Sequence, residues 1–124
     1  MSELRFPQIN QVAVSGRLTH DPEFRITKTG KALVNFSVAL NQNYQDKSGE
    51  WQQETTFIPV VAWDKTAEYI EQRLHKGGSV FITGRLKSRT YKTRDGNRTV
   101  VELLVRHVQL LDKKGGLESE KNQE

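Results

Sequence analysis

Apolar and polar residues alternate along several stretches of this chain, and this period of two constrains its fold more than any other feature. The clearest case spans residues 32–40, where one side is entirely apolar: Ala32, Val34, Phe36, Val38 and Leu40. Such alternation is typical of β-strands that bury one face. Four further segments show strand patterning: residues 11–18, 56–63, 79–91 and 98–111. The sequence therefore predicts a mainly β protein with five strands.

Turn residues separate the predicted strands. Asp21-Pro22 ends the first strand, and Thr29-Gly30-Lys31 turns the chain into the second. The polar stretch between the second and third strands contains Asp46-Lys47-Ser48-Gly49 and is long enough to project as a β-hairpin arm. Asp95-Gly96 lies between the two longest strands and predicts a second hairpin.

One segment has helical periodicity. Ala67, Ile70 and Leu74 are spaced as they would be on one face of a helix. Asp64 is the expected N-cap, and Gly77-Gly78 is the expected left-handed C-terminal cap. This helix falls between the third and fourth predicted strands. Three strands, a helix and two strands is the order of the OB-fold, a small five-stranded Greek-key barrel.

Length and composition limit the domain organisation. The 124 residues, with a mass of 14.2 kDa, fit one domain. We expect residues 1–111 to form the OB-fold and the polar residues 112–124 to form a disordered tail. The chain has no cysteine, which excludes disulfides and thiolate zinc sites. It shows neither a signal-like N-terminus nor a long apolar segment, so we expect a cytoplasmic protein with no membrane contact.

Little in the sequence indicates catalysis. The three histidines lie on separate predicted elements without the spacing of metal ligands: His20, His75 and His107. Asp21 and Glu23 flank Pro22, which favours a turn over a pair of catalytic carboxylates. We therefore expect no enzyme activity, no catalytic residue, no cofactor and no metal.

Positive charge is concentrated on the fourth predicted strand. The net charge of the chain is +4, and residues 85–98 contain six basic side chains and a single acid, Asp95. Alternate positions place three cations and a ring on one face: Arg85, Lys87, Arg89 and Tyr91. Lys92 and Arg94 extend the positive track into the following turn. The charges alone fit either a polyanionic partner or a solvated strand face.

Aromatic side chains favour the polyanionic partner. Phe57 and Trp63 share one face of the third predicted strand, and Tyr44 and Trp51 lie among polar residues of the predicted arm. Rings interleaved with cations supply flat surfaces on which bases stack and charges that follow phosphates. This combination predicts binding of a nucleic-acid single strand with weak sequence preference.

Four segments of the chain form a specific combination: GRLTHDPE, TGKALVNFSVA, VVAWDK and KGGSVFITGRLKSRTY. Through these segments, over about residues 8–111, the chain resembles bacterial single-stranded DNA-binding proteins. The resemblance implies base stacking on the aromatics that match the family's stacking positions: Tyr44, Phe57, Trp63 and Tyr91. It also implies phosphate neutralisation by the matching basic strand and the cations after it: Arg85, Lys87, Arg89, Lys92 and Arg94.

The same resemblance implies a biological role. Family members bind and protect single-stranded DNA in replication, recombination and repair, at the nucleoid, and usually as homotetramers that pair through the first strand. Pro59 departs from the family pattern and should leave its strand locally irregular. The family's acidic, hydrophobic tail tip recruits replication and repair proteins. This chain ends in ESEKNQE without that tip, which leaves such recruitment open.

Other protein classes remain as alternatives. A primosomal or phage OB-fold paralogue would act mainly as a protein-docking adaptor. A cold-shock-like RNA-binding protein would carry motifs that are missing from this sequence. An OB-fold nuclease would need a convergent cluster of acids, for which the sequence offers no candidate.

Overall fold

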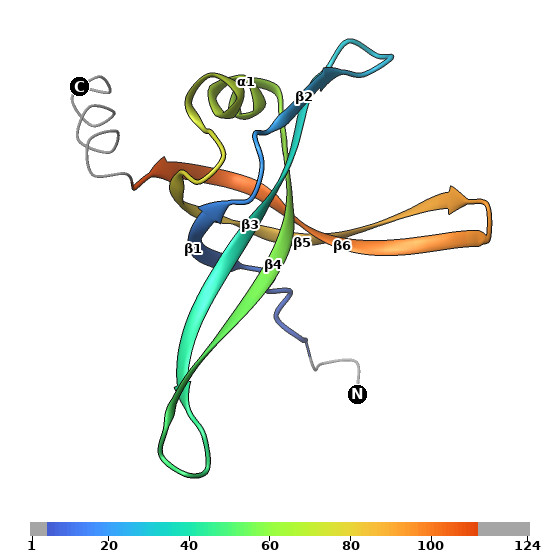
Figure 1. Ribbon diagram of the computed structural model, residues 1–124. Helices are drawn as coiled ribbons and strands as arrows, with labels where there is room; N and C mark the ends of the chain where they lie inside the picture. The colour runs from blue at the N-terminus through green and yellow to red at the C-terminus, as the bar shows by residue number, and fades with distance from the viewer. Residues whose placement is uncertain (1–4, 112–124) are drawn as a thin grey trace.

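The computed structural model describes residues 5–111, which form one barrel. Its elements follow in the order β1 (Val12–Leu18), β2 (Glu23–Ile26), β3 (Ala32–Gln45), β4 (Trp51–Trp63), α1 (Asp64–Arg73), β5 (Ser79–Thr93) and β6 (Gly96–Leu110). The strands lie in the order β1-β5-β6-β4-β3-β2, and an additional pairing of β1 with β3 closes the barrel (Figure 1). The predicted OB-fold with one helix before its last two strands is confirmed. The predicted tail, residues 112–124, lies outside the described residues.

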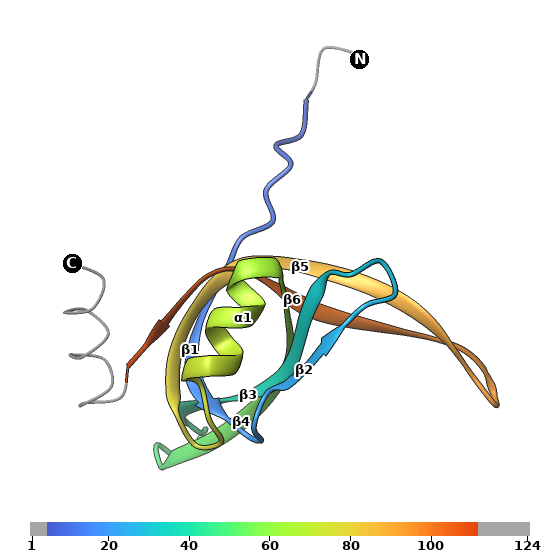
Figure 2. The ribbon, with the colours of Figure 1, turned by 90° about the horizontal axis from the view of Figure 1, so that it is seen from above.

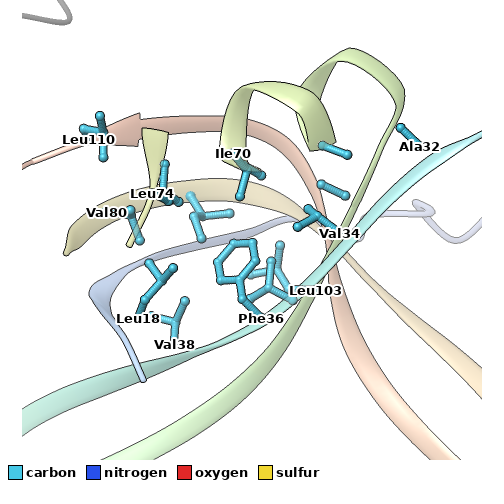
Figure 3. Close-up of a cluster of buried hydrophobic side chains, with 14 residues drawn as sticks. Leu18, Ala32, Val34, Phe36, Val38, Ile70, Leu74, Val80, Leu103 and Leu110 are labelled. Carbon is cyan, nitrogen blue, oxygen red and sulfur yellow. The ribbon is translucent and has the colours of Figure 1, made fainter. Parts of the chain in front are cut away.

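The core is built by the side chains whose alternation defined the strands. Every second residue of β3 from Ala32 to Val38 is buried. Helix α1 adds Ala67 and Ile70, followed by Leu74, and these pack with the strand residues in one cluster (Figure 3). Burial of an aliphatic side chain contributes about 1.5–3 kcal/mol, so this cluster is a main source of the barrel's stability. Seen from above, α1 lies across one end of the barrel (Figure 2).

Two glycines allow strands to approach closely within the barrel. A β-carbon on Gly16 of β1 would collide with the carbonyl oxygen of Ala39 on β3. A β-carbon on Gly84 of β5 would collide with the carbonyl oxygen of Leu104 on β6. The β5–β6 register also shifts between Thr83 and Gly84, as at a β-bulge. Bulges bend strands, and beyond this one β5 and β6 extend out of the barrel as a long hairpin (Figure 1).

Both predicted hairpins are present. β3 and β4 stay in register from Leu33 opposite Trp63 to Gln45 opposite Trp51, and this arm projects away from α1 (Figure 1). The predicted irregularity at Pro59 is wrong, because Pro59 pairs in register with Ser37. The pairing of β4 with β6 begins only at Val60, so this edge of β4 does not require a donor at Pro59.

The predicted caps of the helix are wrong. Asp64 is the first helical residue, the extended Trp63 holds the cap position, and no side chain caps the helix. The reason is that β4 runs directly into α1, so the last strand residue takes the cap position. At the other end, α1 stops at Arg73, and Gly77 lies in the following turn with a φ of 83°. There the Gly77 N–H donates to the carbonyl oxygen of Leu18 at 2.8 Å, so contact with β1 shapes this turn.

Neither a membrane span nor a metal cluster is found in the part of the chain that the structure describes. Within residues 5–111, α1 is too short and polar to cross a membrane. Over the same range, no group of three His, Asp or Glu side chains could hold a metal ion.

Candidate nucleic-acid interface

The outer face of the barrel brings several predicted site residues together. Phe57 and Trp63 lie six positions apart on β4 without a break in register, so they project from the same side. Across from them, β5 presents its basic row. The two strands border a hollow of about 230 Å³ that is lined by Arg25, Leu33, Asn35, Val61, Trp63, Lys87, Arg89 and Glu102. The predicted ring Trp63 and the predicted cations Lys87 and Arg89 therefore lie in one site.

A second hollow continues the first along the rim of the barrel. It is lined by Thr27, Thr29, Lys31, Trp63 and Lys87. The two hollows share Trp63 and Lys87, so together they form one groove. Arg25 and Lys31 come from β2 and the β2–β3 turn, which sequence reasoning did not connect to the site. Four residues are too few for β2 to show a periodic pattern, and only its pairing with β3 brings Arg25 to the groove.

The turn beside the second hollow was predicted from its glycine. The Gly30 N–H donates to the carbonyl oxygen of Thr27 at 2.9 Å, and Gly30 has a φ of 88°. The backbone N–H of Lys31 also donates to the Thr27 hydroxyl at 3.1 Å. These bonds fix the turn from which Lys31 reaches the groove.

Arg89 differs from the other predicted cations because it already has an anionic partner. Its Nε donates to Oε1 of Glu102 and its Nη2 donates to Oε2, both at 3.1 Å. Glu102 is only 5% exposed. The hydrogen bond with Glu102 raises the pKa of Arg89 above its ordinary value. The guanidinium carbon also lies 5.3 Å from the ring centroid of Tyr91, a cation–π distance.

Glu102 was missed at the sequence level, although a signal was present. It is the single charged residue in the apolar run VVELLV of β6. A lone acid in such a run needs a partner when it is buried, and the bulge in β6 hid its register. Its pairing position opposite Lys87 brings it to the groove.

The remaining predicted cations are exposed. Unlike Arg89, the other four predicted cations form no ion pair within residues 5–111: Arg85, Lys87, Lys92 and Arg94. Lys92 pairs with Asn97 near the end of the β5–β6 hairpin, and Arg94 lies in its turn. The positive track thus runs from the groove out along this hairpin.

Tyr44 and Trp51 lie on the β3–β4 hairpin, on different sides. Tyr44 pairs with Gln52, whereas Trp51 pairs with Gln45. Directly opposite residues share a side and successive residues alternate, so Trp51 shares its side with Phe57, whereas Tyr44 does not. Trp51 is 69% exposed and Tyr44 is 45% exposed. Trp51, and not Tyr44, therefore lies on the side of the hairpin that carries Phe57 and Trp63.

The turn of this hairpin is organised by Asp46. Its Oδ1 accepts hydrogen bonds from the Ser48 hydroxyl at 2.7 Å, the Ser48 N–H at 2.9 Å and the Glu50 N–H at 3.0 Å. Its Oδ2 accepts from Nε2 of Gln52 at 3.1 Å. The bond from the Ser48 hydroxyl is the main cause of a lowered pKa at Asp46. The ionised carboxylate therefore holds the turn that precedes Trp51.

Comparison with known proteins decides the family. The model of the Single-strand binding protein family matches residues 9–111, nearly all of the described barrel. The chain belongs to this family. The resemblance noted from the sequence motifs is thereby confirmed.

Individual relatives agree with this single-strand binding protein assignment. Single-stranded DNA-binding protein 2 of Chlorobaculum tepidum is 44% identical over 110 residues, which cover 87% of this chain and 74% of the relative. Single-stranded DNA-binding protein A of Bacillus subtilis is 39% identical over 109 residues, covering 87% of this chain and 62% of the relative.

Two solved structures of single-strand binding proteins have the same fold. A deletion mutant of the single-stranded DNA binding protein from Thermus aquaticus matches with a TM-score of 0.77 and 27% identity, over 87% of this chain and 53% of that chain. A Plasmodium falciparum SSB in complex with ssDNA also gives a TM-score of 0.77, at 24% identity, over 88% of this chain and 100% of that chain. At this identity the second similarity concerns the fold alone.

Proposed function

We propose that this chain binds single-stranded DNA with little sequence preference, by stacking bases on aromatic rings and neutralising phosphates with basic side chains. The observation that carries the proposal is the groove in which the Trp63 ring lies with the cations Arg25, Lys31 and Lys87. Stacking contributes about 1–3 kcal/mol per base and needs no base-specific hydrogen bond. Family membership supports DNA binding over the adaptor alternative.

The proposed site keeps the residues predicted from the sequence. Stacking is assigned to Tyr44, Phe57, Trp63 and Tyr91, and phosphate contact to Arg85, Lys87, Arg89, Lys92 and Arg94. Exposure supports the stacking role, because Phe57 and Tyr91 are large rings that lie largely outside the core. Arg25, Lys31 and Trp51 join the site on the basis of the structure.

In the cell, this binding would protect single-stranded DNA during replication, recombination and repair, in the cytoplasm at the nucleoid. We propose a homotetramer as the working assembly. Exposed apolar side chains on and near β1 and β5 support contact between subunits: Phe6, Ile9 and Phe81. Sedimentation equilibrium at micromolar concentration should give about four times the chain mass of 14.2 kDa. A monomeric mass would contradict the assembly and leave DNA binding intact.

Titration with poly(dT) at two salt concentrations tests the binding function. We expect saturable quenching of tryptophan fluorescence, with weaker binding at high salt because phosphate contacts release counterions. The absence of both quenching and retention of a labelled oligonucleotide would contradict the proposal. Incubation of the same oligonucleotide with Mg²⁺ separates binding from nuclease activity, and we expect it to remain intact.

A further inference from the structure

We propose that Glu102 is a positioning residue of the DNA site, and that it acts through Arg89 on the stacking ring of Tyr91. In this arrangement, Arg89 orients the ring and adds little to the neutralisation of phosphates. The inference rests on the proposed binding function and revises the role of one of its predicted phosphate contacts. It follows from the arrangement of three side chains on β5 and β6.

The ion pair between Arg89 and Glu102 fixes the position of the guanidinium. Arg89 and Glu102 meet through two parallel hydrogen bonds of 3.1 Å each, the bidentate form that fixes the plane of the guanidinium. The Glu102 side chain is 7% exposed, whereas the Arg89 side chain is 51% exposed. The buried carboxylate is therefore the anchor, and the half-exposed guanidinium is the group that it holds.

The charge of the Arg89–Glu102 pair limits what Arg89 can contribute to phosphate binding. A phosphate that drew Arg89 away would leave the buried Glu102 carboxylate without a partner, which is strongly unfavourable. While the pair is intact, its net charge is zero. Lys87 lies directly opposite Glu102 on the neighbouring strand, and its ammonium makes no ion pair within the described residues. Beside this pair on β5, uncompensated charge for phosphates therefore comes from Lys87 and its neighbour Arg85, and hardly from Arg89.

The Arg89 guanidinium also lies over the ring of Tyr91. Arg89 and Tyr91 project from the same side of β5, and the guanidinium carbon lies 5.3 Å from the ring centroid. A guanidinium on one face of a ring leaves the other face open for a base, and Tyr91 is 42% exposed. A ring that is held before binding loses less side-chain freedom when a base stacks on it. The buried acid thus prepares a stacking surface that it does not itself touch.

The decisive variant replaces the pair by a neutral pair, Arg89→Gln with Glu102→Gln, in the full chain. It keeps the net charge of the site, so the slope of log affinity against log salt for poly(dT) should stay at the wild-type value. The affinity should fall by about 2- to 12-fold at every salt concentration, because the ring is no longer held. In a Tyr91→Ala background, the same double replacement should have no further effect.

Arg89→Lys provides a second variant that keeps the buried carboxylate paired and so preserves the fold. Lysine retains the charge and lacks the planar fork, so we expect weaker binding with an unchanged salt slope. The matched control is Lys87→Gln, which should make the slope of log affinity against log salt shallower by about 0.7. A comparable change of slope in the neutral-pair variant would overturn the proposal, since Arg89 would then serve as a phosphate contact. So would an equal loss of affinity with and without Tyr91.

A measurement without DNA separates this inference from the binding function. In the NMR spectrum of the free protein, we expect nuclear Overhauser contacts between the Arg89 side chain and the Tyr91 ring. Glu102→Gln should abolish them while the spectrum of the barrel core is retained. Persistence of these contacts in the variant would overturn the positioning role whether or not the protein binds DNA. A wild-type chain that shows the contacts and does not bind poly(dT) would instead contradict the proposed function.

Discussion

Tyr44 and Trp51 project from opposite sides of the same two-stranded hairpin. The pairs Tyr44–Gln52 and Gln45–Trp51 follow one another in the register, and successive pairs alternate between the two sides. A DNA strand that stacks on Trp63 and continues past Phe57 therefore meets Trp51 if it stays on one side of β4.

This arrangement predicts different effects for the two hairpin rings. Trp51→Ala should weaken binding of long oligo(dT) by about 1–3 kcal/mol, because one stacking surface is lost. Tyr44→Ala is the matched control and should cause the smaller loss. Fluorescence anisotropy of labelled oligonucleotides gives both affinities. A larger loss from Tyr44→Ala would mean that the DNA crosses to the other side of the hairpin.

Trp63 should be a principal source of fluorescence quenching, because it lines both hollows of the groove. In a Trp51→Phe background, poly(dT) should still quench the emission of Trp63. Trp63→Ala should weaken binding by about 1–3 kcal/mol. Circular dichroism checks that the barrel is intact, and an unchanged affinity in a folded variant would remove Trp63 from the site.

Arg85 and Lys87, two cations of β5 that are unpaired within the described residues, should contribute to the salt dependence of DNA binding. Replacing Arg85 and Lys87 together by Gln should make the slope of log affinity against log salt shallower by about 1.4, or about 0.7 for each phosphate contact. Affinity at high salt, where stacking remains, should change little. Lys65→Gln on the exposed side of α1 is the control and should leave the slope unchanged. Retention of the wild-type slope in the double variant would place the DNA path elsewhere.

The stability of the turn at Asp46 should depend on pH. Hydrogen bonding lowers the pKa of Asp46 below its ordinary value of 3.8, so the folded turn favours the ionised carboxylate. The contribution of the ionised Asp46 to stability is therefore complete above pH 3.8. It is lost as the pH falls through the lowered pKa that Asp46 has in the folded protein. NMR titration of the side-chain carboxyl measures this midpoint. A midpoint at or above 3.8 would contradict the hydrogen-bonded geometry, and Asp46→Asn should remove the pH dependence of the turn.

Gly84→Ala should destabilise the barrel, because the added methyl group would collide with the carbonyl oxygen of Leu104. Overpacking of this kind costs about 1–3 kcal/mol. Urea unfolding of the variant measures the loss in the free energy of unfolding. Ser88→Ala, on the exposed part of the same strand, is the control and should have little effect. Equal stability of the two variants would show that β5 and β6 can separate at Gly84 without penalty.

The sequence predicts the barrel well because alternation is a property of each strand by itself. Val34 and Val38 are buried where the pattern placed them, and both hairpin turns lie at the glycine-containing sequences that predicted them. The helix caps were missed because the position of Trp63 is determined by pairing with β3 and not by local capping preference.

The site was predictable only in part, for a related reason. Trp63 and Lys87 could be recognised as a ring and a cation on their own strands. The pairing of Arg89 with Glu102 joins residues 13 positions apart across two strands, and the contribution of Arg25 depends on a strand of four residues. Such contacts depend on register, which a single sequence does not show.

The outer part of the β3–β4 hairpin extends beyond the barrel. From Asn41 to Phe57 no residue is buried, so the arm is held by backbone pairing, by its Asp46 turn and by side-chain hydrogen bonds such as the one that the Thr55 hydroxyl donates to Oδ1 of Asn41. Exposed loop tips of this kind tolerate insertions. The exposed side chain of Lys47 at the tip is therefore a natural place to attach a fluorophore, which would report on DNA at the end of the arm while Ser48 keeps its bonds to Asp46 and the barrel keeps its packing.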